Sequence, residues 1–490
     1  MIADLKPYAE YKESGLPWLG QVPGHWEVRR MKSAVMNVIE QTFEMSADEG
    51  YVALEHVESW TGKAYPQSDS SLFTGQVKRF RQGDVLFGKL RPYLAKVTRI
   101  SKDGVCAGEF FVLRPTDKAV SSAYLEHQLR AKHTIDVING STFGAKMPRA
   151  DWQFCGNLPV LLPPPDEQAA IVRFLDWATG RLERAIRAKR KVIALLGEQK
   201  QAIIHRAVTR GLPAEASAQA GLDPSVPLSA CGHAQAGLKP SGIPWLGDIP
   251  QHWEVRRLGH AICLQTGFPF ASAGFVQGES GIRLLRGINV TPSGLRWDSV
   301  VRWQRKPGDG LDEFELEIGD ITLGMDRPII GAGVRVATVQ ENDMPSLLLQ
   351  RVARLRPTDK LDTKFLVLLL RGRLFRDYIA PIFTGISVPH LSPEQIKGFT
   401  VPLPALIEQR GIVSHVETET SGLETAISRL EREIELLREY RTRLVADVVT
   451  GKLDVREAAA RLPDEPAPDT AEGAAELSDD PETADEEAGP

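Results

Sequence analysis

The sequence predicts an α+β fold in which two mixed α/β domains are each followed by a long helix. The first observation behind this prediction is a repeat: residues 15–30 (GLPWLGQVPGHWEVRR) return with few changes at residues 242–257 (GIPWLGDIPQHWEVRR). The second is that short β-type runs alternate with turn signals and helical stretches, as in mixed folds. The third is a proline-free stretch of helical periodicity at the end of each half. The chain is therefore two copies of one unit.

The composition is that of a globular protein: of 490 residues, 42% are hydrophobic and 25% are charged. No apolar run reaches the roughly 18 residues of a membrane-spanning helix, and the first residues lack the apolar core of a signal peptide. The four cysteines, at positions 106, 155, 231 and 263, form no close pairs. This spacing argues against a disulfide framework and a zinc cluster, so we expect a cytoplasmic protein without membrane contact.

The net charge of −5 comes from the C-terminal end, where residues 462–490 contain 11 Asp or Glu and no Lys or Arg. The rest of the chain is mildly basic, which permits a nucleic-acid partner without requiring one. Proline, alanine and acidic residues offer little apolar surface to bury. Residues 456–490 are therefore predicted to be a disordered acidic tail.

The first domain is predicted to cover residues 1–165. Its β-type runs include residues 85–87 and 109–113, and a helical pattern follows at residues 122–131. The domain ends in LPVLLPPP at residues 158–165, since three successive prolines cannot continue a helix but can lead into one.

The first long helix, a spacer, is predicted at residues 166–212, because residues 166–208 contain no proline and apolar residues recur at helical spacing. A helix of this length cannot bury its apolar stripe against one small domain, so it needs a partner helix. The stripe consists of Ile171, Leu175, Ala178, Leu182, Ala185, Val192, Leu196 and Ile203.

Residues 213–240, rich in Ala, Gly, Pro and Ser, are typical of a flexible linker. The second domain is predicted at residues 241–405 and the second long helix at residues 406–455, and RPTDK (residues 114–118 and 356–360) occurs in both copies. Packing the helices as an antiparallel coiled coil buries both stripes and puts one domain at each end. The second stripe consists of Leu423, Ala426, Leu430, Leu437, Tyr440 and Leu444.

No catalytic motif is recognisable in the sequence. The stretch GDVLFGK at residues 83–89 fits the first part of a phosphate-binding loop, but Leu90 stands where that loop needs Ser or Thr. The second copy, GDITLGM at residues 319–325, also lacks the lysine, which favours a shared strand and turn. Methyltransferase, dinucleotide-binding, zinc-protease and nucleophile-elbow motifs are missing as well. We therefore predict no catalytic residue, no metal and no cofactor.

Three features occur in both halves at equivalent places: the opening of the SGIPWLGDIPQHW type, the P-L-P-x-x-x-x-E/D-E-Q start of each long helix, and the helix end of the LVADVVTGKLDV type. With them the chain resembles the specificity subunit of type I restriction-modification systems over residues 15–212 and 242–455. The resemblance implies a non-catalytic subunit with two target-recognition domains, each reading half of an interrupted DNA sequence. It also implies that the helices are a spacer that docks two methyltransferase subunits, with restriction subunits joining the complex.

Two similar domains held apart by a rigid rod suit this role, because they can engage two major-groove faces about 34–36 Å apart or more. A non-catalytic scaffold that holds partner proteins apart without specific DNA reading would use the same rod, so this alternative stays open. The recognised bases, the gap length and the activity of the restriction system do not follow from the sequence.

Basic and aromatic side chains near repeated turns are the candidates for contact with double-stranded DNA, since Arg reads guanine and Lys or Arg neutralises phosphate. A solvated turn or strand edge is the alternative interpretation of each position. The candidates are Lys78, Arg79, Lys89, Arg91, Tyr93, Lys146, Arg149, Arg302, Arg305, Lys306, Arg327, Ser387 and His390.

Residues that are identical in the two copies favour a scaffold role, because domains that read different half-sites need not share reading residues. This applies to His25-Trp26 and His252-Trp253, which we expect to be packing residues. A Glu-Gln pair also opens each long helix, where a carboxylate complements the helix dipole. Contact with a partner subunit is the second interpretation of these pairs, which are Glu167, Gln168, Glu408 and Gln409.

Overall fold

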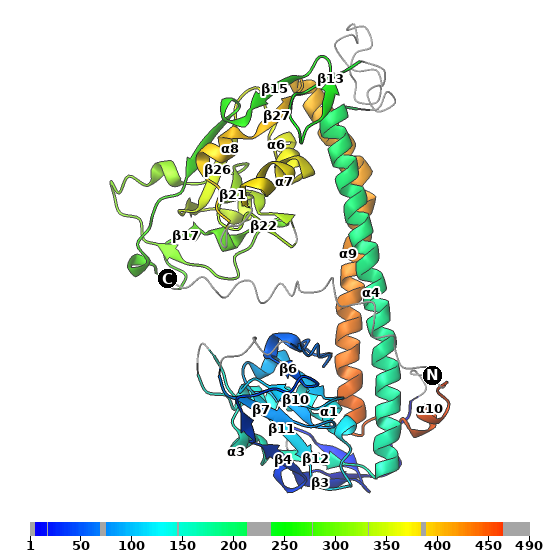
Figure 1. Cartoon of the computed structure of the whole chain (residues 1–490). Helices are drawn as coiled ribbons and strands as arrows, with labels where there is room; N and C mark the ends of the chain where they lie inside the picture. The colour runs from blue at the N-terminus through cyan, green and yellow to red at the C-terminus, as the bar shows by residue number, and fades with distance from the viewer. Residues whose placement is uncertain are drawn as a thin grey trace. The chain divides into compact units, whose positions relative to one another are not determined.

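The computed structural model describes residues 5–463, apart from residues 17, 69–74, 145–146, 213–236, 277, 332 and 384–388. This part of the chain divides into two compact units. The first unit contains the residues up to Arg190 and those from Leu430 onward, and the second contains the residues from Lys191 to Arg429. Each unit holds one globular domain with segments of both long helices (Figure 1).

The long helices are α4 (Pro165–Arg210) and α9 (Leu406–Val449). Proline suits the start of α4 because an N–H in the first turn has no partner within the helix anyway. Left-handed glycines follow both helix ends, Gly211 with φ of 76° and Gly451 with φ of 74°, and they turn the chain out of the helix. The second helix is therefore shorter than the predicted range of residues 406–455.

Within each unit, α4 and α9 pack against each other in antiparallel directions. In the first unit, residues early in α4 meet residues late in α9, and Lys189 pairs with Glu433 farther along. In the second unit, residues late in α4 meet residues early in α9, and Lys200 pairs with Glu424 at 2.6 Å. The buried contact residues are Ile171, Phe174, Leu175, Ala178, Leu444, Val445 and Val448 in the first unit, and Ile204, Ala207, Val208, Ile412, Val413 and Val416 in the second.

The apolar stripe predicted for α4 is wrong at Val192, whose residue surface is 44% exposed. Ile186 and Ile204 are buried, whereas the predicted neighbours Ala185 and Ile203 are half-buried. The reason is geometric. An α-helix has 3.6 residues per turn, so a stripe traced in steps of three and four drifts from the buried face over several turns.

A four-stranded antiparallel sheet forms the centre of each domain, with the order β4-β11-β8-β9 in the first and β16-β26-β21-β24 in the second. The two copies thus share a fold and not only a sequence motif. The predicted strands at residues 85–87 and 109–113 are confirmed. The strands are β4 (Val35–Val38), β8 (Val85–Gly88), β9 (Val97–Arg99), β11 (Phe110–Pro115), β16 (Ile262–Thr266), β21 (Ile321–Gly324), β24 (Val336–Thr338) and β26 (Val352–Pro357).

Short helices pack on this sheet in both domains. In the first domain, Leu125 and Leu129 share a buried cluster with Val85 of β8, and the helix predicted at residues 122–131 is confirmed. In the second, Phe365 and Leu366 pack in the same way. The helices are α1 (Ser122–Arg130), α2 (Lys132–Gly140) and α3 (Trp152–Cys155), followed by α6 (Thr363–Arg371), α7 (Arg373–Ile379) and α8 (Pro393–Gly398).

Each domain has an ion pair beside its central sheet. It joins the Asp of the repeated Gly-Asp dipeptide to the Arg that begins the repeated RPTDK segment. Asp84, 2% exposed, receives two hydrogen bonds of 2.7 Å from the Arg114 guanidinium, which raises the pKa of this arginine. Asp320, 3% exposed, pairs in the same two-pronged way with Arg356. The stretch that resembled a phosphate-binding loop is therefore a strand and turn in both domains, fixed by a buried carboxylate.

The repeated opening segments form strand pairs at the base of each domain. The pairs are β1 (Tyr11–Glu13) with β2 (Gln21–Pro23), and β3 (Glu27–Arg30) with β12 (Pro159–Leu162). Their counterparts are β13 (Leu238–Pro240) with β14 (Asp248–Pro250), and β15 (Glu254–Arg257) with β27 (Thr400–Leu403). The strand before each long helix is thus tied to the repeated segment.

A second sheet in each domain differs between the copies. The first domain has the order β5-β7-β10-β6, with β5 (Gln41–Thr42), β6 (Gly50–Val52), β7 (Val77–Phe80) and β10 (Gly104–Cys106). The second has β20-β17-β25, with β17 (Ile282–Leu285), β20 (Arg302–Trp303) and β25 (Ser346–Leu348). It also has the two-stranded pairs β18 (Val290–Thr291) with β19 (Gly294–Leu295), and β22 (Ile329–Ile330) with β23 (Gly333–Val334).

The start of the predicted acidic tail is wrong, because the residues up to 463 belong to the first unit. The short helix α10 (Arg456–Ala460) follows α9, and Val455 and Ala459 are buried in the same cluster as Tyr8. The Asp454 N–H donates to the Lys6 carbonyl at 2.8 Å, so this segment also pairs with the beginning of the chain. Residues 464–490 of the predicted tail lie outside the described residues.

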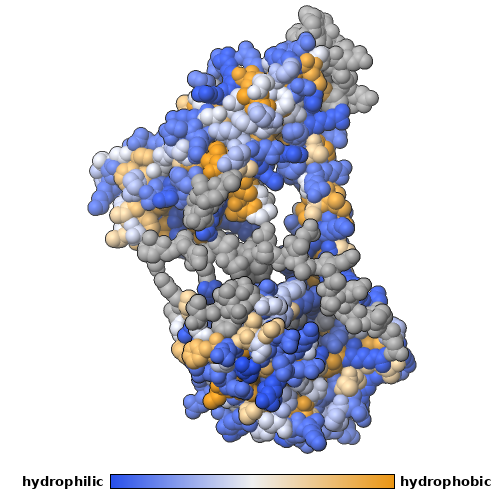
Figure 2. Space-filling model, viewed as in Figure 1, coloured by the Kyte–Doolittle hydropathy of each residue, from blue (hydrophilic) through white to orange (hydrophobic). Residues whose placement is uncertain are grey.

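Hydrophilic residues cover most of the face seen in Figure 2, with hydrophobic residues in small groups. Within the described ranges, no helix combines the length and apolarity needed to cross a membrane. In the same part of the chain, no three His, Cys, Asp or Glu side chains gather as metal ligands would.

Candidate nucleic-acid interface

Each globular domain is attached to its own long helix through a buried Trp–Glu contact. The fully buried Trp26 indole donates to Glu167 Oε1 at 2.9 Å, and the His25 ring lies 2.8 Å from Oε2. In the second unit, Trp253 donates to Glu408 at 2.9 Å and His252 lies 3.0 Å from the same carboxylate. The expectation that these repeated pairs are packing residues is confirmed for Trp26 and Trp253, which are 0% exposed, whereas the His25 side chain is 43% exposed.

The glutamine that follows each glutamate joins three backbone groups of its domain. The Gln168 amide donates to the carbonyls of Ala119 and Pro163, and its Oε1 accepts from the Ser121 N–H at 2.9 Å. Gln409 makes the same bonds to Lys360, Pro404 and Asp362. Both glutamines are 0% exposed, and Glu167 and Glu408 are 5% and 6% exposed. Partner binding by these four residues stays a prediction, and their burial does not favour it.

Four of the predicted DNA-contact residues of the first domain, Lys89, Arg91, Tyr93 and Arg149, lie in one loop cluster. Arg91 follows β8 with φ of 51°, and its N–H donates to the Pro148 carbonyl at 2.8 Å. A β-bridge links Leu90 to Arg149, whose guanidinium lies 3.1 Å from Glu109. We call Lys89, Arg91, Tyr93, Glu109 and Arg149 the first turn cluster. Tyr93 is 41% exposed, and Lys146 lies outside the described residues.

Lys78 and Arg79 lie on β7, beside this cluster rather than in it. The Lys78 ammonium donates to the Phe110 carbonyl at 2.6 Å; burial, and then the charge of Lys89, lower its pKa. Arg79 instead forms an ion pair with Glu49, which is not part of the first turn cluster. Lys78 therefore adds positive charge near the first turn cluster, whereas the charge of Arg79 is compensated locally.

The second domain builds the corresponding cluster with different side chains. Arg327 follows β21 with φ of 43°, and its N–H donates to the Pro389 carbonyl at 2.8 Å. Asp326 forms a β-bridge with His390, accepts a hydrogen bond of 2.6 Å from its ring and pairs with Arg351 at 3.0 Å. We call Asp326, Arg327, Arg351 and His390 the second turn cluster. Ser387 lies outside the described residues.

The basic run at residues 302–306 lies elsewhere in the second domain. Arg302, on β20, donates to the Gly281 carbonyl at 3.1 Å. Arg305 pairs with Asp309, Asp312 and Glu315, which raise the pKa of this arginine, and the hydrogen bonds from its guanidinium lower the pKa of Asp309 to about 2. Because three carboxylates surround Arg305, its charge is compensated within the loop. Among the described residues, the hydrogen bonds and ion pairs of Arg302, Arg305 and Lys306 do not involve the second turn cluster.

Sequence reasoning missed the residues that pair across the clusters, which are Glu109, Asp326 and Arg351. Glu109 and Arg351 occupy the same place in the two copies, shortly before β11 and β26. A signal was present in the alignment of the halves, because RPTDK places these residues opposite each other. The ion pairs of Glu109 with Arg149 and of Arg351 with Asp326, however, join residues that are 40 and 25 positions apart along the chain.

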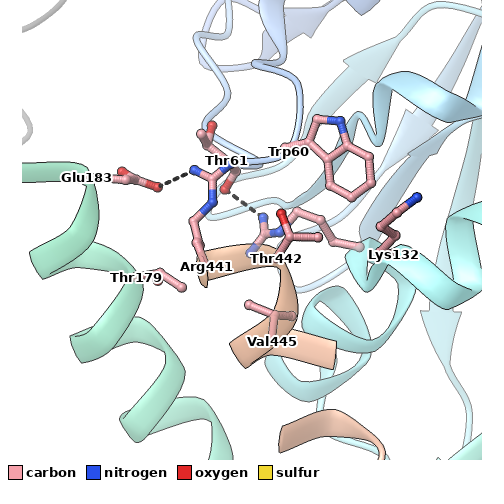
Figure 3. Close-up of a pocket in the computed structure, with 9 residues that line it drawn as sticks. Trp60, Thr61, Lys132, Thr179, Glu183, Arg441, Thr442 and Val445 are labelled. Atoms are coloured by element: carbon pink, nitrogen blue, oxygen red, sulfur yellow. Dashed lines mark hydrogen bonds and ion pairs between the residues drawn. The ribbon is translucent and has the colours of Figure 1, made fainter. Parts of the chain in front are cut away.

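A polar network joins the first domain to the helix segments of its own unit. Figure 3 shows a pocket in which Trp60 and Thr61 face Glu183 of α4 and Arg441 of α9. Glu183 pairs with Lys63 at 2.8 Å and with Arg441 at 3.8 Å. The neighbouring carboxylates balance the cations here, so this network connects a domain to its helices and is a poor candidate for binding an anion.

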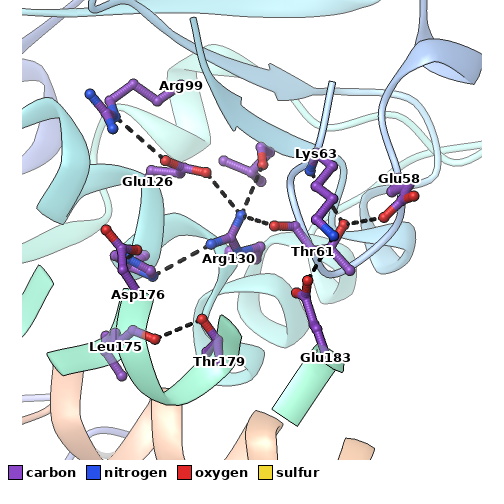
Figure 4. A network of polar contacts seen from close by, with 12 residues as sticks. Glu58, Thr61, Lys63, Arg99, Glu126, Arg130, Leu175, Asp176, Thr179 and Glu183 are labelled. Carbon is purple, nitrogen blue, oxygen red and sulfur yellow. Dashed lines mark hydrogen bonds and ion pairs between the residues drawn. The ribbon is translucent and has the colours of Figure 1, made fainter. Parts of the chain in front are cut away.

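Arg130 lies at the centre of this network, as Figure 4 shows. Its guanidinium donates to the Thr61 carbonyl at 2.7 Å and pairs with Glu126 at 2.9 Å. In the second domain the corresponding Arg371 donates twice to the Val336 carbonyl instead. The loop that carries Thr61 thus connects the first domain to the long helices of its unit, and the contact of this loop with Arg130 is particular to the first copy.

Comparison with known proteins gives one family. The model of the type I restriction modification DNA specificity domain matches residues 262–436. The MjaVIII specificity subunit of Methanocaldococcus jannaschii is 25% identical over 361 residues, which are 73% of this chain and 76% of that subunit. The EcoAI specificity subunit of Escherichia coli is 34% identical over 174 residues, which are 35% of this chain and 28% of that subunit.

A solved chain from the type I R-M system, described for its complex assembly and conformational transition, has a similar fold. It matches 88% of this chain and 99% of its own length at 17% identity, with a TM-score of 0.54. The α+β fold and the resemblance seen in the sequence are thereby confirmed. In sequence and in fold, the chain is thus similar to the specificity subunits of type I restriction-modification systems.

Proposed function

We propose that this chain reads a bipartite, interrupted DNA site, one part with each globular domain. The observation that carries the proposal is that the same turn cluster is built twice with different side chains. Arg91 and Arg327 occupy equivalent turns, while Arg149 and His390 occupy equivalent loop positions. Two copies of one frame with different polar residues are what reading two different half-sites requires, because base edges differ and the phosphate backbone does not.

The spacing between the half-sites is set, in this proposal, by α4 and α9 paired as one antiparallel coiled coil. The antiparallel contacts found separately within each unit support it. With 46 residues, α4 is about 70 Å long at about 1.5 Å per residue. This length exceeds the roughly 34–36 Å between major-groove faces one turn apart, so the rod can leave bases unread between the two parts.

The same helices recruit the partner subunits, which we propose are two methyltransferase subunits and, in the larger complex, restriction subunits. Apolar side chains remain exposed on both helices, and exposed apolar groups on otherwise polar helices are typical of protein interfaces. The most exposed ones are Val192 and Leu195 on α4, and Ile407, Leu436 and Tyr440 on α9. Such a complex acts on chromosomal DNA, which agrees with the cytoplasmic location expected from the sequence.

The test is a modification-sensitive long-read map of genomic DNA from cells that make this chain with its neighbouring methyltransferase. Cells that lack only this chain are the control. We expect a methylated motif in two short parts with an unread gap, which disappears when the chain is deleted. An unchanged map with an active methyltransferase would contradict the proposal and leave the non-catalytic scaffold as the function.

Exchanging one domain sharpens the experiment. Residues 241–405 are replaced by the corresponding domain of a related specificity subunit, with both long helices kept. We expect one part of the motif to change while the other part and the gap length stay the same. A change in both parts would show that the domains do not read independently.

A further inference from the structure

We infer that the left-handed arginine turn is a phosphate anchor common to both domains, and that the charged residues around it that differ select the bases. This inference rests on the proposed function. It divides the turn clusters into a part that holds the DNA backbone, Arg91 and Arg327, and a part that reads sequence, which is Glu109 with Arg149 in the first domain and Asp326 with His390 and Arg351 in the second.

The anchor is the same in geometry as well as in residue type. Arg91 follows β8 and Arg327 follows β21, which are equivalent strands in the central sheets of the two domains. These arginines have φ of 51° and 43°, and each donates its N–H to a proline carbonyl at 2.8 Å. A buried proline follows each of them. Left-handed backbone is unfavourable for a residue with a side chain, and such conformations concentrate at functional sites. Both copies nevertheless keep arginine there.

The surroundings of the anchor differ in charge. In the first domain the carboxylate of Glu109 stands before β11 and the cation of Arg149 lies on the loop. In the second, the cation of Arg351 takes the place before β26, and the carboxylate of Asp326 lies on the turn. The residue before the last strand of the central sheet is therefore a carboxylate in the first domain and a cation in the second, and its partner lies on the loop in one and on the turn in the other, while the arginine of the anchor is the same.

The physics of DNA recognition assigns these two parts different tasks. Phosphate contacts fix position and carry no sequence information, so two domains can share them whatever they read. Carboxylates accept from cytosine, and guanidinium groups donate to guanine, so a carboxylate in the first domain and a cation at the same position in the second suit different base pairs. Glu109, Arg149, Arg351 and His390 are all at least partly exposed, so they are available for such contacts.

The experiment uses the complex of this chain with its methyltransferase subunits and a duplex carrying the mapped motif. Arg91→Asn and Arg327→Asn remove the charge, and Asn tolerates the left-handed backbone. We expect each variant to bind the duplex more weakly and to leave the methylated motif unchanged. The slope of log K against log salt should become shallower by about 1, the value for one lost phosphate contact. Arg373→Gln, an exposed cation of α7, is the matched control and is expected to leave slope and motif unchanged.

The reading part is tested by charge removal within one cluster. Glu109→Gln with Arg149→Gln is expected to relax or change one base pair in one part of the methylated motif. Asp326→Asn with His390→Gln is expected to do the same in the other part only. The slope against salt should change less in these variants than in the anchor variants.

Several results would overturn the division. One is a new methylated motif with Arg91→Asn; another is a motif unaltered by both paired variants. Arg91→Lys keeps the positive charge and should therefore bind more tightly than Arg91→Asn. If it binds as weakly as Arg91→Asn, the arginine acts structurally and not through its charge. A melting temperature measured for each variant identifies loss of folding. Absence of any chain-dependent motif with the unaltered chain would instead contradict the proposed function itself.

Discussion

The two globular domains share the contacts that hold them together and differ in their second sheets and turn clusters. Asp84 with Arg114 and Asp320 with Arg356 fix the same turn, and both domains attach to their helix through Trp and Glu. The second sheets and the turn clusters differ. The comparison teaches that the residues shared by the halves hold each domain together, whereas their differences gather in the second sheets and in the turn clusters to which the proposed function assigns DNA reading.

The attachment to the helix also differs in one respect. In the first unit the Tyr8 hydroxyl adds a hydrogen bond to Glu167, and Arg456 of α10 lies over the Tyr8 ring at 5.1 Å. Burial and Glu167 together raise the pKa of this tyrosine far above its ordinary value. Glu167 thus has three side-chain partners, whereas Glu408 has two among the described residues.

The largest effect is expected from removing the buried indoles. Trp26→Ala and Trp253→Ala should each lower the free energy of unfolding by about 3–5 kcal/mol, because a large cavity opens and a carboxylate loses its donor. The loss should be smaller for Trp26, since Tyr8 and His25 still hold Glu167. Denaturant unfolding, with limited proteolysis to locate the affected unit, measures both. Equal losses would show that Tyr8 contributes nothing to the attachment.

A smaller, pH-dependent effect is expected at His133, which corresponds to the buried Leu374 of the second domain. Burial, and then the charge of Lys452, lower the pKa of His133 to about 4. The unfolded chain binds this proton at about pH 6.5, so the stabilisation is present above that pH and is lost as pH falls toward 4. His133→Leu should therefore reduce the loss of stability between pH 7 and pH 5 by on the order of 2 kcal/mol.

The matched comparison is His205→Leu in the second unit, where burial also lowers the pKa of the histidine. We expect the same direction with a smaller size, because His205 is less buried. Denaturation midpoints at pH 7 and pH 5 give both effects. If His133→Leu leaves the pH dependence unchanged, the acid sensitivity of the first domain has another origin.

The smallest effect is expected at the helix contact. Lys189, which pairs with Glu433, corresponds to Leu430 in the second helix. Because both side chains are partly exposed, Lys189→Leu should change the free energy of unfolding by only about 0–1 kcal/mol. A double-mutant cycle with Glu433→Gln isolates the ion pair. A coupling above about 2 kcal/mol would show that the pair specifies how the helices align.

Local patterns in the sequence determined the repeat, the two long helices and the central strands. Helical periodicity and proline positions depend on near neighbours along the chain, and these are visible without the fold. The resemblance to specificity subunits was visible for the same reason, since the motifs that carry it, at the domain openings and helix starts, are contiguous. The Gly-Asp dipeptides and the RPTDK segments were also visible as repeats, but the ion pairs between Asp84 and Arg114 and between Asp320 and Arg356 were not.

Only the tertiary structure decided which distant residues meet. It placed Ala459 in the core of the first unit, although the sequence had assigned this residue to the disordered acidic tail. It brought Glu109 to Arg149 and Arg351 to Asp326, and it buried Glu167 and Gln168, which the sequence left available to a partner. Burial and ion pairing are set by strands and helices far apart along the chain, and no local pattern encodes that juxtaposition.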